Sequence, residues 1–116
     1  MTADEFRAIA MSFPGAVEGF NMGSTFFKVN GKDLARLLSD SDSMLTGLSA
    51  DEIDHLIEIE PATFHASQHF RDGRCIAARL ASLDPAMLHS ILERRFRAIA
   101  KKSVVKAYDA GEIAAG

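Results

Sequence analysis

Histidine and cysteine are the side chains of this sequence best suited to chemistry, and three of them lie close together. His65 and His69 have the i, i+4 spacing that puts two side chains on one helix face, and Cys75 follows. They could ligate zinc, or Cys75 could be a nucleophile with a histidine as base. Zinc sites usually show tighter ligand pairs, and a thiol in an apolar segment usually behaves as a small hydrophobic side chain. We therefore expect no metal, no cofactor and no catalytic residue, in a protein that is not an enzyme.

A basic segment near the C-terminus is the feature that suggests a partner. Within residues 94–106 the chain has six basic residues and no acidic one, although its formal net charge is −3. A domain with one positive end can steer an anionic partner to that end. The alternative is that these side chains complement a helix dipole and stay solvated. The six residues are Arg94, Arg95, Arg97, Lys101, Lys102 and Lys106.

Helical phase divides this basic segment. Arg94, Arg97 and Lys101 lie within about 60° of one another on a helix and form an outward stripe. Arg95 lies at the edge of the apolar face, which indicates a structural salt bridge or a snorkelling stem. Lys102 and Lys106 would fall on the buried face, so we predict an interruption near 101–103, with Ser103 capping a short final helix. Other basic residues that could extend the positive surface are Lys28, Lys32, Arg36, Arg71 and Arg74.

Length and composition indicate one ordinary folded domain. The chain has 116 residues, 47% of them hydrophobic and 25% charged. No apolar run approaches the roughly 20 residues that span a bilayer, and the first residues lack a signal-peptide pattern. A single cysteine suits a reducing compartment. We therefore expect a cytoplasmic protein without a membrane segment.

The first half of the chain contains clear helix and hairpin signals. Thr2 and Glu5 match a capping box, followed by an apolar helical stripe that ends at Pro14. Segments 26–29 and 34–38 flank an Asn30-Gly31 turn, which predicts a hairpin. Residues 39–43 are expected to form a polar loop, and residues 44–46 a short strand.

The second half continues with two helices around a strand. Ser49 and Glu52 form another capping box for a helix that ends near Pro61. Residues 62–73 are ambiguous, since Phe64 could begin a strand, whereas 75–80 alternates as a strand should. Asp84 as N-cap followed by Pro85 starts a long helix with an apolar face.

The order of these elements carries a family resemblance. The helix ends in FPGAVEG at 13–19, the hairpin reads FKVNGKDLA at 27–35, and the second capped helix ends in EPATF at 60–64. This pattern resembles the MmcQ/YjbR family of small bacterial proteins over nearly the whole chain. The resemblance implies an α+β fold of the CyaY-like type, with an antiparallel sheet packed against N-terminal and C-terminal helices in a double-wing arrangement. Members often carry Trp near the last strand, whereas this chain has none.

Members of that family are commonly labelled DNA-binding, and the basic segment agrees with the label. We expect a single domain over residues 1–116, monomeric or a small homo-oligomer, that binds the DNA phosphate backbone without sequence specificity. About six neutralised phosphates would give a slope near −5 for log affinity against log salt. The residues expected to contact nucleic acid are Arg94, Arg97, Lys101, Lys102, Lys106, Lys28 and Lys32.

The alternative is a protein–protein interaction or chaperone-like module that does not bind nucleic acid. Phe26 and Phe27 must point to opposite faces of a strand, so one of them is core and the other lies under a helix or is exposed. An exposed apolar patch at this point would favour the alternative.

Overall fold

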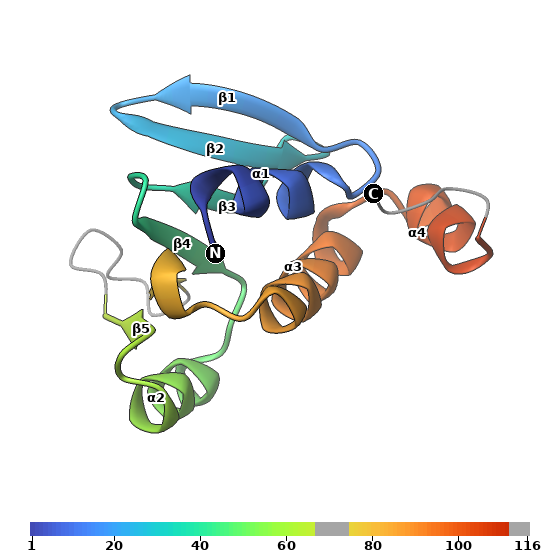
Figure 1. Ribbon diagram of the computed structural model, residues 1–116. Helices are drawn as coiled ribbons and strands as arrows, with labels where there is room; N and C mark the ends of the chain where they lie inside the picture. Colours follow the sequence, from blue (N-terminus) through green and yellow to red (C-terminus); the bar gives the residue numbers. More distant parts are fainter. Residues whose placement is uncertain (67–74, 112–116) are drawn as a thin grey trace.

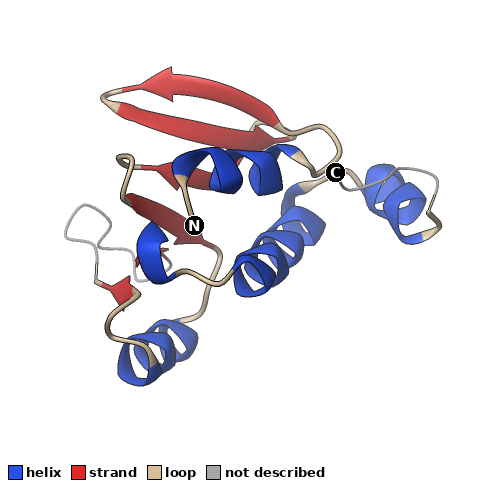
Figure 2. Cartoon of the chain, in the orientation of Figure 1, coloured by secondary structure: helices blue, strands red, loops and turns tan. Residues whose placement is uncertain are grey.

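The computed structural model describes residues 1–66 and 75–111, which form an antiparallel sheet flanked by helices (Figures 1 and 2). The α+β fold expected from the sequence is confirmed. Within these described ranges, six strands lie in the order β1-β2-β3-β4-β6-β5. Their bounds are β1 Val17–Asn21, β2 Ser24–Val29, β3 Lys32–Leu37, β4 Asp42–Thr46, β5 Phe64–His65 and β6 Cys75–Arg79. The helices are α1 Ala3–Met11, α2 Ala50–Ile59, α3 Pro85–Ile99 and α4 Lys102–Asp109, with a 3-10 turn at Leu80–Ser82.

Local signals determine where most elements start and stop. The capping boxes of Thr2 with Glu5 and of Ser49 with Glu52 are both present, so two N–H groups at the start of each of α1 and α2 gain side-chain partners. Asn30 and Gly31 have φ angles of 53° and 74°, as a tight hairpin turn requires. The expected hairpin is therefore confirmed, with β2 and β3 as its strands.

Two expectations for the first half need correction. β1 was not predicted, because Val17 to Asn21 is too polar for a buried strand and mostly exposed. The expected loop at 39–43 is shorter, since β4 already begins at Asp42. Ser43 fits there because its hydroxyl donates to the Ala78 carbonyl at 2.8 Å, which satisfies a fully buried polar group.

Helices α1 and α3 cover one face of the sheet (Figure 1). The core between them contains Phe6, Phe27, Leu88 and Phe96, each with no exposed surface. Burial of such large side chains contributes roughly 1.5–3 kcal/mol each. Phe27 is thus the core member of the Phe26–Phe27 pair, and Phe26 points to the other face.

A β-bulge in β3 determines which residues lie on the face of the sheet away from α1 and α3. Phe27 pairs with Ala35 and Lys28 with Asp33, so Leu34 is skipped in the register. Leu34 and Ala35 are both buried, whereas Asp33 and Arg36 lie together, joined by a 3.0 Å ion pair. We call the face that carries Phe26, Lys28, Asp33 and Arg36 the outer face, because it points away from α1 and α3.

The interruption between the last two helices is confirmed, but its predicted cap is wrong. Ala100 and Lys101 are extended, and α4 starts at Lys102 with Lys101 as N-cap. Ser103 lies inside the first turn and does not cap it. The position of α4 follows from tertiary contacts instead, since Tyr108 packs beside Phe96 with ring centroids 5.2 Å apart.

Candidate nucleic-acid interface

Arg94 lies on the exposed side of α3, as predicted, but it has an acidic partner. Its Nη1 donates to Oε2 of Glu52 on α2 at 2.7 Å. This hydrogen bond is the main cause that lowers the pKa of the Glu52 carboxyl below its usual value. A guanidinium paired in this way has less charge to offer a phosphate.

Arg97 is paired as well. Its guanidinium lies 2.6 Å from the Asp109 carboxylate, 3.8 Å from Glu93 and 5.6 Å from the Tyr108 ring centroid. The hydrogen bond from Arg97 lowers the pKa of Asp109. Arg97 therefore connects α3 to α4, so two of the three predicted stripe residues have charge partners within the fold.

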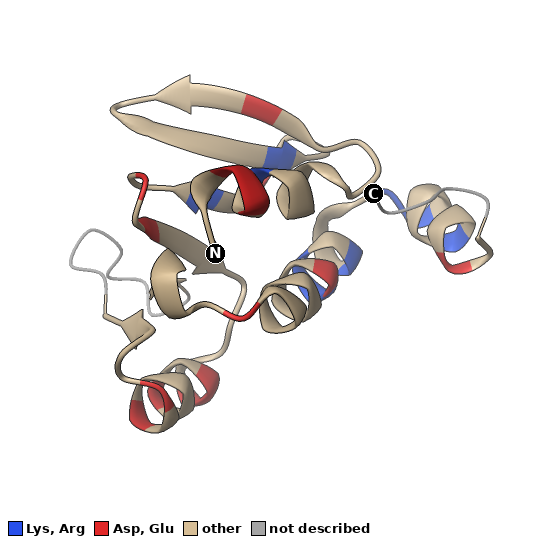
Figure 3. Cartoon of the chain, viewed as in Figure 1, with Lys and Arg blue, Asp and Glu red and all other residues tan. Residues whose placement is uncertain are grey.

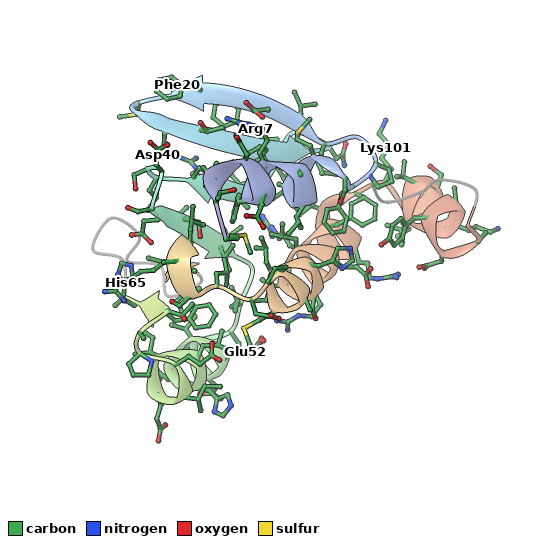
Figure 4. All side chains as sticks on the ribbon, viewed as in Figure 1. Arg7, Phe20, Asp40, Glu52, His65 and Lys101 are labelled. Carbon is green, nitrogen blue, oxygen red and sulfur yellow. The ribbon has the colours of Figure 1, made fainter. Side chains whose placement is uncertain are left out.

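The three C-terminal lysines are exposed but do not continue that stripe. Lys101 lies in the extended link before α4, labelled in Figure 4, and Lys102 and Lys106 lie on α4. The helical row of Arg94, Arg97 and Lys101 is therefore broken at its third member, because the helix ends at Ile99.

The hairpin lysines lie around a hollow to which a residue of α3 also contributes. Its volume is about 410 Å³, and Lys28, Lys32, Arg36 and Arg95 all line it. Asp33 is the acidic residue in its wall, and Met44, Thr46 and Cys75 complete the lining with Gly31. We call this feature the basic hollow. It brings the side chain of Lys28 on β2 close to that of Arg95 on α3, which the sequence alone could not establish.

Arg95 reaches the basic hollow from the helix side of the sheet. Its Nε donates to the Asp33 carbonyl at 2.9 Å, and its Cδ lies beside Gly47, where a Cβ would come within 2.9 Å. The side chain therefore lies between the start of β3 and the end of β4. The sequence placed Arg95 in a structural role, which this hydrogen bond supports, but its position in the hollow was missed.

The charge of the basic hollow is strongly positive. It contains four cationic side chains and one carboxylate, and that carboxylate is engaged by Arg36. Among the described residues, Nε of Arg36 and Oδ1 of Asp33 are both buried without a hydrogen-bond partner, so the hollow has one unused donor and one unused acceptor. Like charges held this close repel one another, and an anion in the hollow would offset that repulsion.

The turn of the β2–β3 hairpin extends this positive region toward the C-terminal lysines. The Asn30 side-chain amide donates to the Ile99 carbonyl at 3.0 Å, two residues before Lys101. Figure 3 shows basic positions on β2, β3 and the later turns of α3, with acidic positions on the neighbouring β1 and α1 and on α2, whose Glu52 pairs with Arg94.

Of the three candidate chemical residues, the described His65 and Cys75 have different side-chain partners. His65 contacts the Asp42 carboxylate at 3.1 Å, whereas the Cys75 thiol donates to the Thr46 hydroxyl at 3.4 Å. His69 lies outside the described residues, as do Arg71 and Arg74. Within residues 1–66 and 75–111 no group of three metal-ligating side chains is found. In the same part of the chain, no helix combines the length and the apolar character needed to cross a membrane.

A second hollow of about 510 Å³ lies between α2 and α3 but does not suit an anion. Glu52, Asp84 and Arg94 supply its charged groups, and Arg94 is already paired with Glu52. The basic hollow is therefore the better candidate for a site that binds phosphate.

The comparisons with known proteins concern the fold. The structure is similar to the crystal structure of Deinococcus radiodurans protein DR2400, which contains the family-model domain DUF419. The TM-score is 0.72 over 95% of this chain and 86% of that one, with 17% sequence identity. No protein-family model matches the chain, and no curated protein does. This similarity supports a small α+β domain. The function has to be inferred from the side chains of the candidate site.

Proposed function

We propose that this protein binds the phosphate backbone of nucleic acid, without sequence specificity, at the basic hollow. One observation carries the proposal: Lys28, Lys32, Arg36 and Arg95 come from two strands and a helix to line one hollow with a single carboxylate. Phosphate contacts of this kind supply the sequence-independent part of nucleic-acid affinity. Lys101 stands two residues after Ile99, which the hairpin turn contacts, and would extend the interface.

This proposal shifts the interface away from the middle of α3. Arg94 and Arg97 are engaged by Glu52 and by Asp109, so we assign them to the fold. Lys102 and Lys106 are exposed on α4 and remain secondary candidates. The role is binding, and no catalytic residue is proposed.

The experiment that tests the proposal is a salt titration of duplex DNA binding. Arg36 is paired with Asp33, so three neutralised phosphates, at Lys28, Lys32 and Arg95, predict a slope of about −2.7 for log affinity against log salt. The paired substitutions Lys28→Gln and Lys32→Gln should reduce that slope by about 1.8. The matched control replaces Lys102 and Lys106 by Gln, with the same loss of charge.

Two results would contradict the proposal. One is the absence of any gel shift at low salt, or an affinity that does not change with salt. The other is a larger loss for the Lys102 and Lys106 control than for the hairpin pair, which would place the interface on α4.

We further propose membership of the MmcQ/YjbR family, a CyaY-like double-wing arrangement and a cytoplasmic location. The element order and the 13–19, 27–35 and 60–64 motifs support the family proposal. The single cysteine is consistent with the location.

A second candidate function is binding of a protein partner, or of another copy of this chain, along strand β1. β1 is an edge of the sheet, and its hairpin exposes Val17, Phe20 and Met22 by 62%, 73% and 95%. Edge strands offer unpaired backbone groups to another strand. Light scattering should then show a dimer that Phe20→Lys dissociates, and a monomer at all concentrations, together with no captured partner, would exclude this reading.

A further inference from the structure

Phe26 is an aromatic side chain on the outer face, directly beside the basic hollow. It pairs across the sheet with Arg36 and stands two residues before Lys28 on the same strand. Both of these neighbours line the hollow. Residues two apart on a strand are separated by about 6.7 Å. The ring and the hollow are therefore close enough for a single nucleotide to contact both.

The sequence makes room for this ring. Phe26 is opposite Gly19 on β1, and a Cβ at position 19 would come within 2.2 Å of the ring tip. Only glycine lets the ring lie across the neighbouring strand. The ring is half-buried, and the Lys28 ammonium lies over it at 4.9 Å from the centroid.

We propose that the protein prefers single-stranded nucleic acid, with one base stacked on Phe26 and an adjacent phosphate in the basic hollow. This inference rests on the proposed function and specifies its ligand. An unpaired base has a free π-face, whereas bases in a duplex are stacked on their neighbours and cannot reach an aromatic side chain on a sheet. Lys28 would turn from the ring to the phosphate as the base takes its place.

Stacking of a base on an aromatic side chain changes affinity by about 5- to 150-fold when the ring is removed. It is tolerant of sequence, because every base has a π-face. An aromatic platform beside a cationic groove therefore suits a binder of single strands without sequence readout.

The chain contains no Trp, so Phe26→Trp would place a single fluorescent reporter on the platform. Its emission should be quenched saturably by a thymidine oligonucleotide. The matched control is Phe20→Trp, at an exposed position of the same hairpin, labelled in Figure 4, on the opposite face of the sheet. We expect much weaker quenching of the control at the same bound fraction.

An abasic oligonucleotide of equal length and charge separates stacking from phosphate binding. Wild-type protein should bind the thymidine oligonucleotide at least about fivefold more tightly than the abasic one. Phe26→Leu, which keeps apolar volume but removes the ring, should abolish this ratio, and Phe26→Tyr should keep it.

The outcomes distinguish the two proposals. Equal binding of both oligonucleotides, with salt dependence intact, would overturn the stacking inference and leave the phosphate site standing. Failure to bind either oligonucleotide or duplex at low salt would overturn both. Loss of the ratio in Phe26→Leu with the affinity for the abasic chain unchanged would support both.

Discussion

The Arg95 guanidinium donates through Nε to the backbone carbonyl of Asp33, 62 residues earlier in the chain. This contact ties the middle of α3 to the start of β3 and brings a fourth cation to the hollow lined by Lys28, Lys32 and Arg36. One side chain thus has a structural partner and a place in the candidate interface. We therefore expect the hydrogen bond of Arg95 to contribute to stability and its charge to contribute to anion binding.

The substitutions Arg95→Lys and Arg95→Met distinguish the hydrogen bond of Arg95 from its charge. Both lose the guanidinium hydrogen bond to Asp33, so we expect each to lower the free energy of unfolding by about 1 kcal/mol. Only Arg95→Met loses the charge, so it alone should reduce the salt slope of DNA binding, by about 0.9. Urea unfolding and salt titrations measure the two effects. Equal salt slopes for the two variants would remove Arg95 from the interface.

Gly47→Ala should be more harmful than an ordinary glycine substitution. Gly47 has φ of 84°, and its added Cβ would come within 2.9 Å of the Arg95 Cδ. We expect a loss of about 2 kcal/mol from backbone strain and displacement of Arg95 together. Gly15→Ala is the control, with φ of 78° and open space around it. We expect Gly47→Ala to unfold at a lower urea concentration than Gly15→Ala. Equal midpoints for the two variants would show that Arg95 is not displaced.

Gly19→Ala should disturb the Phe26 platform without changing any charge. Its Cβ would overlap the ring tip at 2.2 Å, so the ring must rotate away from β1. We expect weaker binding of the thymidine oligonucleotide and unchanged binding of the abasic one. Fluorescence anisotropy with labelled oligonucleotides measures both. A parallel loss for the two ligands would show that the substitution damages the fold of the hairpin instead.

Tyr108→Phe should loosen the docking of α4. The Tyr108 hydroxyl donates to the Glu93 carboxylate at 2.7 Å, which is the main cause that raises the pKa of this tyrosine. Removing the hydroxyl should cost about 1 kcal/mol and increase hydrogen exchange of the α4 amides. Exchange in α1 should change much less, since its capping box is untouched. Uniform acceleration throughout the chain would contradict a local role.

The ion pairs of Arg97 with Asp109 and Arg94 with Glu52 predict acid sensitivity. Arginine lowers the pKa of both carboxyls, from ordinary values of 3.8 and 4.5. A carboxyl with a lowered pKa in the folded state stabilises the fold above its unfolded-state pKa and loses this contribution as the pH falls through the folded value. Stability should therefore fall below about pH 4.

Asp109→Asn and Glu52→Gln are the variants that test the acid effect. Each should be less stable than wild type at pH 7 and lose less on acidification, since the titrating group is gone. Thermal unfolding between pH 7 and pH 3 measures the difference. Unchanged pH profiles in both variants would assign the acid response to other carboxyls.

Local sequence patterns were sufficient to predict much of the fold. Capping residues and the Asn30-Gly31 turn act within four residues of themselves, so their effect is visible in the chain alone. β1 was missed because its strand is held by pairing with β2 and not by apolar burial. The start of α4 was misplaced because Tyr108 and the Arg97–Asp109 pair position it through contacts with α3.

The candidate interface, like the fold, could be predicted only in part from the sequence. The sequence by itself determined a chain with a charge asymmetry, a lysine-flanked hairpin turn and an amphipathic helix with basic residues. Only the tertiary structure decided which cations are engaged, because charge pairing depends on distances between elements far apart in the chain. It placed Glu52 and Asp109 against Arg94 and Arg97, paired Asp33 with Arg36, and left Lys28, Lys32 and Arg95 beside that pair around one hollow. Asp33 and Arg36 on either side of the β3 bulge, and Arg95 beside Gly47, line that hollow, and neither placement follows from the spacing of residues along the chain.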